Sequence, residues 1–367
     1  MGTVFRRALQ TSPTLEYGGR GAMRFGELVR EFGLIGYGLV GATAALACIA
    51  IDPRAALTGW LAAAVLLQSL PLGALVLLAT MRLIRGQWEA ELRSGCEAAA
   101  GLWFLSALAF VPVLLGLGAI YDWPHAPAQT AFLDVWLNVL PFVLRTLLWF
   151  FALAAIARSQ VGGHASASAS ALALIVMILG AWLLAADWFM TLDIRFHSWA
   201  FGLQVFALEM CTAYAALLLL RLTRRVPPQR PALLGALMIV FLLLWLCFQA
   251  VPYLAIRSDD LSAGAEWYAA RAEGGWRWVL GAIGLLGIVP LLALLLPLVR
   301  RSQRALAFAA VSVLVGKSLE FAWIAIPGRG PVAVLSFLFA LCGFVCFAAS
   351  YLAPGSRWRF PGRRSAA

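Results

Sequence analysis

The chain has few charged residues, few histidines and no redox or nucleotide-binding motif. Charged side chains make up 12% of its 367 residues, and its three histidines, His125, His164 and His197, all fall between long apolar runs. The six cysteines are scattered, without CxxC, CxxCH or iron–sulfur spacing. There is no Walker motif, no HExxH and no GxGxxG in a strand–helix context. We therefore expect no metal site, no redox cofactor and no catalytic residue in this chain. A membrane b-type haem, for example, needs histidine ligands inside the spans.

Apolar residues are abundant instead. They make up 63% of the chain, and the mean hydropathy is +0.88, which is more apolar surface than a soluble domain can bury. The sequence therefore predicts an all-α polytopic membrane protein. Ten runs reach spanning length: 33–51, 57–81, 98–120, 132–157, 169–190, 199–220, 232–256, 276–299, 304–326 and 330–353.

The basic residues are distributed unevenly over the connections. Of the 28 Lys and Arg residues, 20 fall on one predicted side of the ten spans, six fall on the other, and Arg145 and Lys317 lie within spans. This bias predicts that both termini are cytoplasmic. The predicted organisation is a cytoplasmic arm over 1–32, one membrane domain over 33–353 and a basic cytoplasmic tail over 354–367. The +11 charge then indicates topology and contact with anionic lipid, and we expect no nucleic-acid partner.

A faint parallel repeat suggests how the spans are grouped. The second span ends in Met81–Arg85 (MRLIR), and the sixth, four spans later, ends in Leu220–Arg224 (LRLTR). We expect two four-helix bundles plus two flanking helices.

Ionisable residues within or beside the spans are the first candidate site. A charge at mid-bilayer costs about 2.5–3.5 kcal/mol on insertion scales, so these groups should face the protein interior. One hypothesis is that they only fix helix packing as ion pairs. The other is a proton path from the outer mouth, because buried carboxyls and histidine can take up and release protons. Its candidates are Asp193, His197, Asp187 and Glu209, with Lys317, Glu320 and Arg145 alongside.

Polar and aromatic residues near the outer boundary form a second, weaker candidate. Trp182, Gln249 and Tyr253 could surround a quinone head group, which needs hydrogen-bond donors and aromatic walls. The alternative is that the tryptophans near this boundary, including Trp123, Trp188 and Trp267, form an interfacial belt.

Four stretches together resemble a known family. Residues 187–199 (DWFMTLDIRFHSW) resemble the DW-x-MSLD-x-x-W-x-S signature of the ActF-like membrane subunits of alternative complex III, in the NrfD-like (polysulfide reductase) superfamily. Gly86–Trp88 with Glu97, and Asn138 with Phe142 and Arg145, are similar to the family's third and fourth spans. Glu266–Tyr268, Arg271 and Gly274–Trp276 are similar to its WY-x-x-R…GGW loop. The chain differs from the pattern at Ile194, where the family has proline, and at Phe196, where it has tryptophan.

The resemblance implies a subunit of a quinol:electron-acceptor oxidoreductase without its own redox centre. It implies iron–sulfur and multihaem cytochrome subunits as partners, a second NrfD-like subunit, a possible quinone or quinol ligand, and a multi-pass location in the bacterial inner membrane. The matched polar positions are Asp187, Asp193, Glu266, Arg271 and Arg145, and Trp276 closes the loop motif. Two alternatives remain: a stand-alone secondary transporter, which would show inverted repeats and broken helices, and a lipid-linked glycosyltransferase, which would need a larger acidic outer loop.

Overall fold

Ten helices in the described part of the chain are long and apolar enough to cross a membrane. The computed structural model describes residues 33–125, 135–162, 165–193, 195–257 and 262–353. The predicted arm and tail, with Asp134, His164 and Ile194, lie outside these ranges. The predicted class, an all-α polytopic membrane protein, is confirmed.

The helices follow the predicted runs closely. The first described span is Gly33–Ala50, which ends in the 3-10 turn η1 (Cys48–Ala50). The others are α2 (Pro53–Leu83), α3 (Trp88–Ala100), α4 (Trp103–Ala109), α5 (Val111–Leu115), α6 (Leu117–Ile120), α8 (Val139–Gln160), α9 (Ala167–Trp188), η2 (Met190–Leu192), α10 (Phe201–Leu222), α11 (Pro231–Arg257), α12 (Ser262–Ala272), α13 (Trp276–Leu295), α14 (Pro297–Arg301), α15 (Gln303–Ala325) and α16 (Pro331–Leu352).

Local capping chemistry sets several of the boundaries. The side chain of Asp52 accepts a hydrogen bond from the backbone N–H of Ala55 at the start of α2, and Ser302 does the same for Ala305 in α15. Proline also occurs at or next to the first helical position of α2, α14 and α16, where its missing N–H costs nothing.

The third span differs from the prediction. The hydropathy pattern predicts this span over 98–120, whereas the helix begins at Trp88. The prediction starts too late because the first turns of α3 carry polar residues, which lower the hydropathy of that segment. The span is also divided into short helices, with Gly101 at the end of α3, Pro112 in the first turn of α5 and Gly116 at its end. Proline removes a backbone donor and glycine weakens the helix, so the chain bends at these points.

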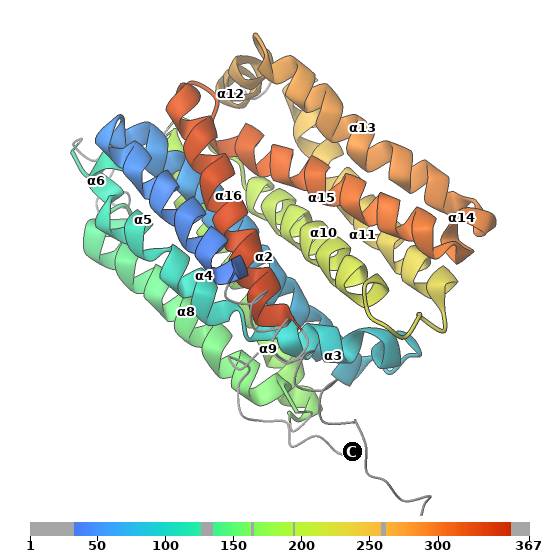
Figure 1. Cartoon of the computed structure of the whole chain (residues 1–367). Coiled ribbons are helices and arrows are strands. Elements are labelled where there is room, and N and C mark those ends of the chain that lie inside the picture. Colours follow the sequence, from blue (N-terminus) through green and yellow to red (C-terminus); the bar gives the residue numbers. More distant parts are fainter. Residues whose placement is uncertain (1–32, 126–134, 163–164, 194, 258–261, 354–367) are drawn as a thin grey trace, which may run out of the picture.

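The spans form two groups of four. One contains α2, the third span, α8 and α9, and the other contains α10, α11, α13 and α15. The two most buried spans, α2 and α10, pack against each other and join the groups. In Figure 1, α12 and α6 lie at one end of the helices and α3 lies at the other. We call the α12 end the outer end, following the charge prediction.

The first span and α16 flank the two groups. The α16 helix packs along the length of α2, and the first span meets α16 where Gly41 faces Gly343. A Cβ atom on Gly59 of α2 would overlap the carbonyl oxygen of Ala333 in α16, so the two backbones touch there. The predicted arrangement of two bundles with flanking helices is therefore observed.

The aromatic belt is only partly present. Trp199 and Trp278 are exposed, as belt residues should be, but Trp123, Trp188 and Trp267 are each less than 7% exposed. Burial inside the bundle, instead of at the lipid boundary, makes these three part of the protein core.

Candidate functional site

Glu209 of α10 is buried at the junction between the two groups of helices. It is 2% exposed, and it accepts a 3.1 Å hydrogen bond from the Nε2 atom of Gln68 on α2. The oxygen of the same amide accepts a 3.0 Å bond from the indole Nε1 of Trp149 on α8. In the part of the chain that the structure describes, no ion pair involves Glu209. We call Trp149, Gln68 and Glu209 the Glu209 centre.

Lys317 and Glu320 form a second buried centre on α15. The Nζ atom of Lys317 lies 2.9 Å from the carboxylate of Glu320, and the side chains are 0% and 1% exposed. The Trp245 indole of α11 donates to both Glu320 oxygens at 3.0 and 2.9 Å, and the Lys317 ammonium lies 3.0 Å from the centroid of that ring. The positive charge of Lys317 balances the negative charge of Glu320, and the described hydrogen bonds of this centre are all donated to the Glu320 carboxylate.

A hydrogen-bonded chain leads from this pair toward the outer end. Gln249 of α11 donates to Glu320 and accepts a 2.7 Å bond from Gln204 of α10. Gln204 accepts a 3.1 Å bond from the hydroxyl of Tyr268 on α12. Burial raises the pKa of Tyr268, so its phenol keeps its proton and acts as the donor. We call this run, Tyr268–Gln204–Gln249–Glu320, the outer chain.

Asp187 lies in a second ion pair, in the other group of helices. Its carboxylate is 2.6 Å from the Nε atom of Arg145 on α8 and accepts a 3.1 Å bond from the Trp136 indole. Arg145 also donates to the backbone oxygen of Trp136 and lies over its ring. The hydroxyl of Thr191 donates to the Asp187 carbonyl, which ties η2 to the end of α9.

The outer loop after α9 rests on α12 through stacked aromatic rings. Phe196 stacks on Trp267 with ring centroids 4.3 Å apart, and the Arg271 guanidinium lies 3.5 Å from the Trp267 centroid on α12. Trp323 of α15 donates to the Arg271 carbonyl at 2.9 Å. Burial lowers the pKa of Arg271 to about 10, so it stays charged at neutral pH. Phe196 therefore supplies the aromatic ring through which the loop contacts α12.

The described hydrogen bonds and ion pairs of the two predicted proton-path residues on the outer loop stay within that loop. Asp193, which is partly exposed, pairs with exposed Arg195 at 3.4 Å. The ring of His197 bonds to the carbonyl oxygen of Arg195 on the same loop.

The predicted quinone-binding residues have the following contacts among the described residues. Trp182 is 38% exposed and donates to the carbonyl of Trp199, and Gln249 belongs to the outer chain. The side chain of Tyr253 lies outside the described part of the structure. In the loop motif, Glu266 is exposed and Trp276 is half-buried against the core.

The predicted proton-path residues therefore lie in separate places in the structure, and the described hydrogen bonds do not form one continuous path through them. Asp187 pairs with Arg145, Glu320 pairs with Lys317, and Glu209 bonds to Gln68; no hydrogen bond or ion pair among the described residues joins these three places. Both Glu209 and the outer chain involve α10, but they lie against different neighbouring helices. Among the described residues, no group of three or more His, Cys, Asp or Glu is placed to hold a metal ion.

Sequence reasoning missed the neutral partners and one acid. Gln68, Trp149, Gln204 and Trp245 each complete a centre, but a search for ionisable residues in spans passes over amides and indoles. Glu91 at the inner end was also missed. It is 5% exposed, lies 2.5 Å from an Arg221 nitrogen and accepts bonds from the backbone N–H groups of Gln229 and Arg230 just before α11.

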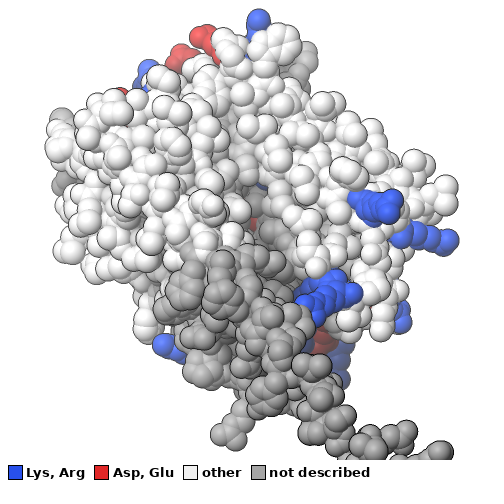
Figure 2. Space-filling model, in the orientation of Figure 1, with Lys and Arg blue, Asp and Glu red and all other residues white. Residues whose placement is uncertain are grey.

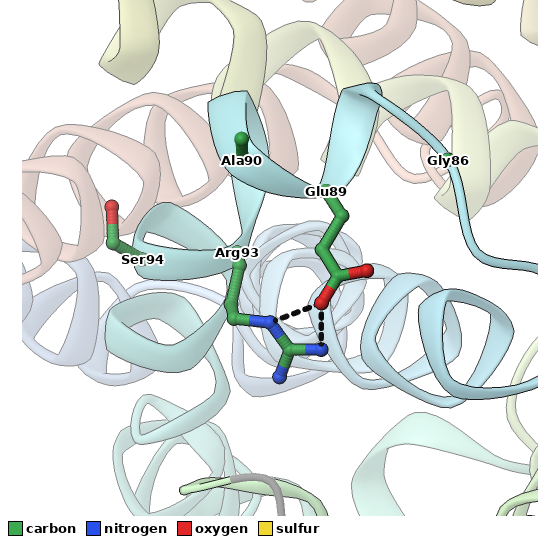
Figure 3. A pocket seen from close by; sticks show the side chains of 5 residues that line it. All are labelled: Gly86, Glu89, Ala90, Arg93 and Ser94. Carbon is green, nitrogen blue, oxygen red and sulfur yellow. Dashed lines mark hydrogen bonds and ion pairs between the residues drawn. The ribbon is translucent and has the colours of Figure 1, made fainter.

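One face of the molecule has a hollow between α16 and α15, with acidic and basic atoms visible at its floor (Figure 2). A pocket of about 390 Å³ lies at the inner end, lined by Gly86, Glu89, Ala90, Arg93 and Ser94 (Figure 3). Arg93 there already binds Glu89 at 2.6 Å, and Ser94 accepts a bond from Arg224, so the pocket's polar groups have partners within the chain.

Comparison with known proteins gives no assignment. No family model matches the chain, and no curated protein matches it.

Proposed function

We propose that this chain is an integral membrane subunit of a quinol:electron-acceptor oxidoreductase of the alternative complex III type. In this role it holds no redox centre of its own, forms part of the scaffold on the quinone side, and carries protons. The proposal places it in a bacterial inner membrane with iron–sulfur and multihaem cytochrome subunits and a second NrfD-like subunit. Its family basis is the ordered set of motifs from Gly86 to Trp276.

The proposed proton role depends on one observation, the burial of the Glu209 carboxyl without a cation beside it among the described residues. A carboxyl buried at the junction of two helix groups without a cation partner among the described residues is costly as a fixed charge. A carboxyl in this position is better suited to carrying a proton, because it can stay neutral most of the time and ionise only briefly. The outer chain links α12 to Glu320 through side chains, and among the described contacts it does not reach Glu209.

The two carboxyl centres have different parts in this proposal. Glu320 receives donors from Lys317, Trp245 and Gln249, which hold it as an anion. Glu209 receives one donor, from Gln68. We therefore assign the mobile proton to Glu209 and a fixed electrostatic role to the Lys317–Glu320 pair.

Glu209→Gln tests the proton role. The change removes the titratable group but keeps its size and hydrogen-bonding capacity, so the assembled complex should form in normal yield while proton translocation per electron is largely lost. Glu273→Gln, at an exposed position of the α12–α13 connection, is the control and should translocate normally. Unchanged coupling in Glu209→Gln would remove Glu209 from the path.

Co-purification tests the membership of a redox complex. An affinity tag on this chain should bring down subunits with haem absorbance and iron–sulfur signals. A homogeneous preparation of the chain alone that transports a solute would instead support the secondary transporter.

A further inference from the structure

The direction of the hydrogen bonds in the Glu209 centre determines which cation can bind to the Glu209 carboxylate. The Trp149 indole has an N–H donor and no acceptor, so its 3.0 Å bond fixes the Gln68 carbonyl oxygen toward Trp149. The Gln68 NH₂ group must then point at Glu209, 3.1 Å away. With the reverse amide orientation, two N–H groups would face each other at Trp149.

A metal cation would need the opposite arrangement. Hard cations are held by several oxygen ligands, including side-chain and backbone carbonyls. Here the nearest amide presents its hydrogens to Glu209, and those hydrogens would repel a cation. A protonated carboxyl fits the same surroundings, because its carbonyl oxygen accepts the Gln68 N–H bond and the group needs no counter-charge.

We infer that the Glu209 centre takes a proton and excludes sodium, and that Trp149 sets this specificity by orienting Gln68. Trp149 is thus a positioning residue, which acts on Glu209 through the amide. The inference rests on the proposed proton path and names its coupling ion.

The test uses a hydrophobic carbodiimide on the purified full chain in detergent, so it needs no redox partner. N,N′-dicyclohexylcarbodiimide modifies carboxyl groups that are protonated in apolar surroundings, and peptide mass spectrometry locates the label. The expected result is a label on Glu209 that is lost in Glu209→Gln and kept in Glu320→Gln. Replacing choline chloride with sodium chloride at equal ionic strength should leave the labelling rate unchanged.

Trp149→Phe tests the orienting role. Without the indole donor, Gln68 can rotate its oxygen toward Glu209, so sodium should now slow the labelling. Trp278→Phe, which removes an exposed indole, is the control and should behave as the parent chain does.

Two results would overturn the inference. One is sodium protection of Glu209 in the parent chain, which would show a cation site there. The other is labelling of Glu320 in place of Glu209, which would reverse the assignment of the neutral carboxyl. Both are read without electron transfer, so they are distinguishable from a failure to co-purify with redox subunits.

Discussion

The free-energy cost of a buried charged residue in this bundle depends on how completely its charge is balanced by a partner. The Lys317–Glu320 pair shows this most clearly, because both charges are fully buried and all described donors converge on Glu320. Removing one member of such a pair leaves an uncompensated charge, whereas removing both leaves a neutral site.

A double-mutant comparison at this pair should therefore be strongly non-additive. We expect Lys317→Met to destabilise the chain by about 3–5 kcal/mol, the typical cost of breaking a buried pair. Lys317→Met combined with Glu320→Gln should recover much of that loss. Thermal unfolding in detergent measures both. A double variant less stable than the single one would contradict the matched-charge account.

Individual helices are positioned by close backbone contact and by capping at their ends. The α2–α16 contact depends on Gly59, where a Cβ atom would overlap the Ala333 carbonyl oxygen. Helix α11 is held at its start by Glu91, a carboxylate from α3 in the other group. Each contact joins segments that are distant in the sequence.

Gly59→Ala should push α16 away from α2. Overpacking of this kind costs about 1–3 kcal/mol, more than the alanine gains in helix propensity. Gly284→Ala on α13 is the matched control, because a Cβ there meets nothing within 4 Å. The two melting temperatures should differ, with Gly59→Ala the lower; equal values would show that the helices move apart freely.

Glu91→Gln should loosen the inner connection between α10 and α11. The glutamine cannot neutralise Arg221, and leaving a charged partner unsatisfied costs about 1–3 kcal/mol or more. We expect trypsin to cleave at exposed Arg225 severalfold faster than in the parent chain. Glu89→Gln, which breaks a more exposed pair on the same helix, should have little effect. Similar cleavage in both variants would mean that Glu91 does not hold the connection.

At the scale of the whole molecule, the charge bias predicts the orientation in the membrane. Residues Ser198 and Arg225 lie in connections on opposite predicted sides. In a cysteine-free background, Ser198→Cys should react with an impermeant maleimide added to intact spheroplasts, and Arg225→Cys should react only after lysis. The reverse pattern would invert the topology and place the outer chain on the cytoplasmic side.

Most of the architecture could be predicted from the sequence. Spans of apolar residues must form helices in lipid, because each backbone polar group needs an internal partner, so ten runs gave ten helices. The third span was the exception, since Glu89 and Arg93 on the first turns of α3 lower its hydropathy.

The candidate site could be predicted only in part from the sequence. Burial costs identified Arg145, Asp187, Glu209, Lys317 and Glu320 as groups that need partners. They could not identify the partners, because Gln68 lies 141 positions before Glu209 and a neutral amide gives no hydropathy signal.

Composition and the bilayer's demand for internal hydrogen bonding are enough to predict the class of protein, the number of spans and the scarcity of buried charge. The packing of the helices is needed to learn that Lys317 neutralises Glu320, that Arg145 neutralises Asp187, and that Glu209 contacts an amide donor alone among the described contacts. Those pairings depend on how helices far apart in the chain are rotated and packed, which is a property of the whole bundle.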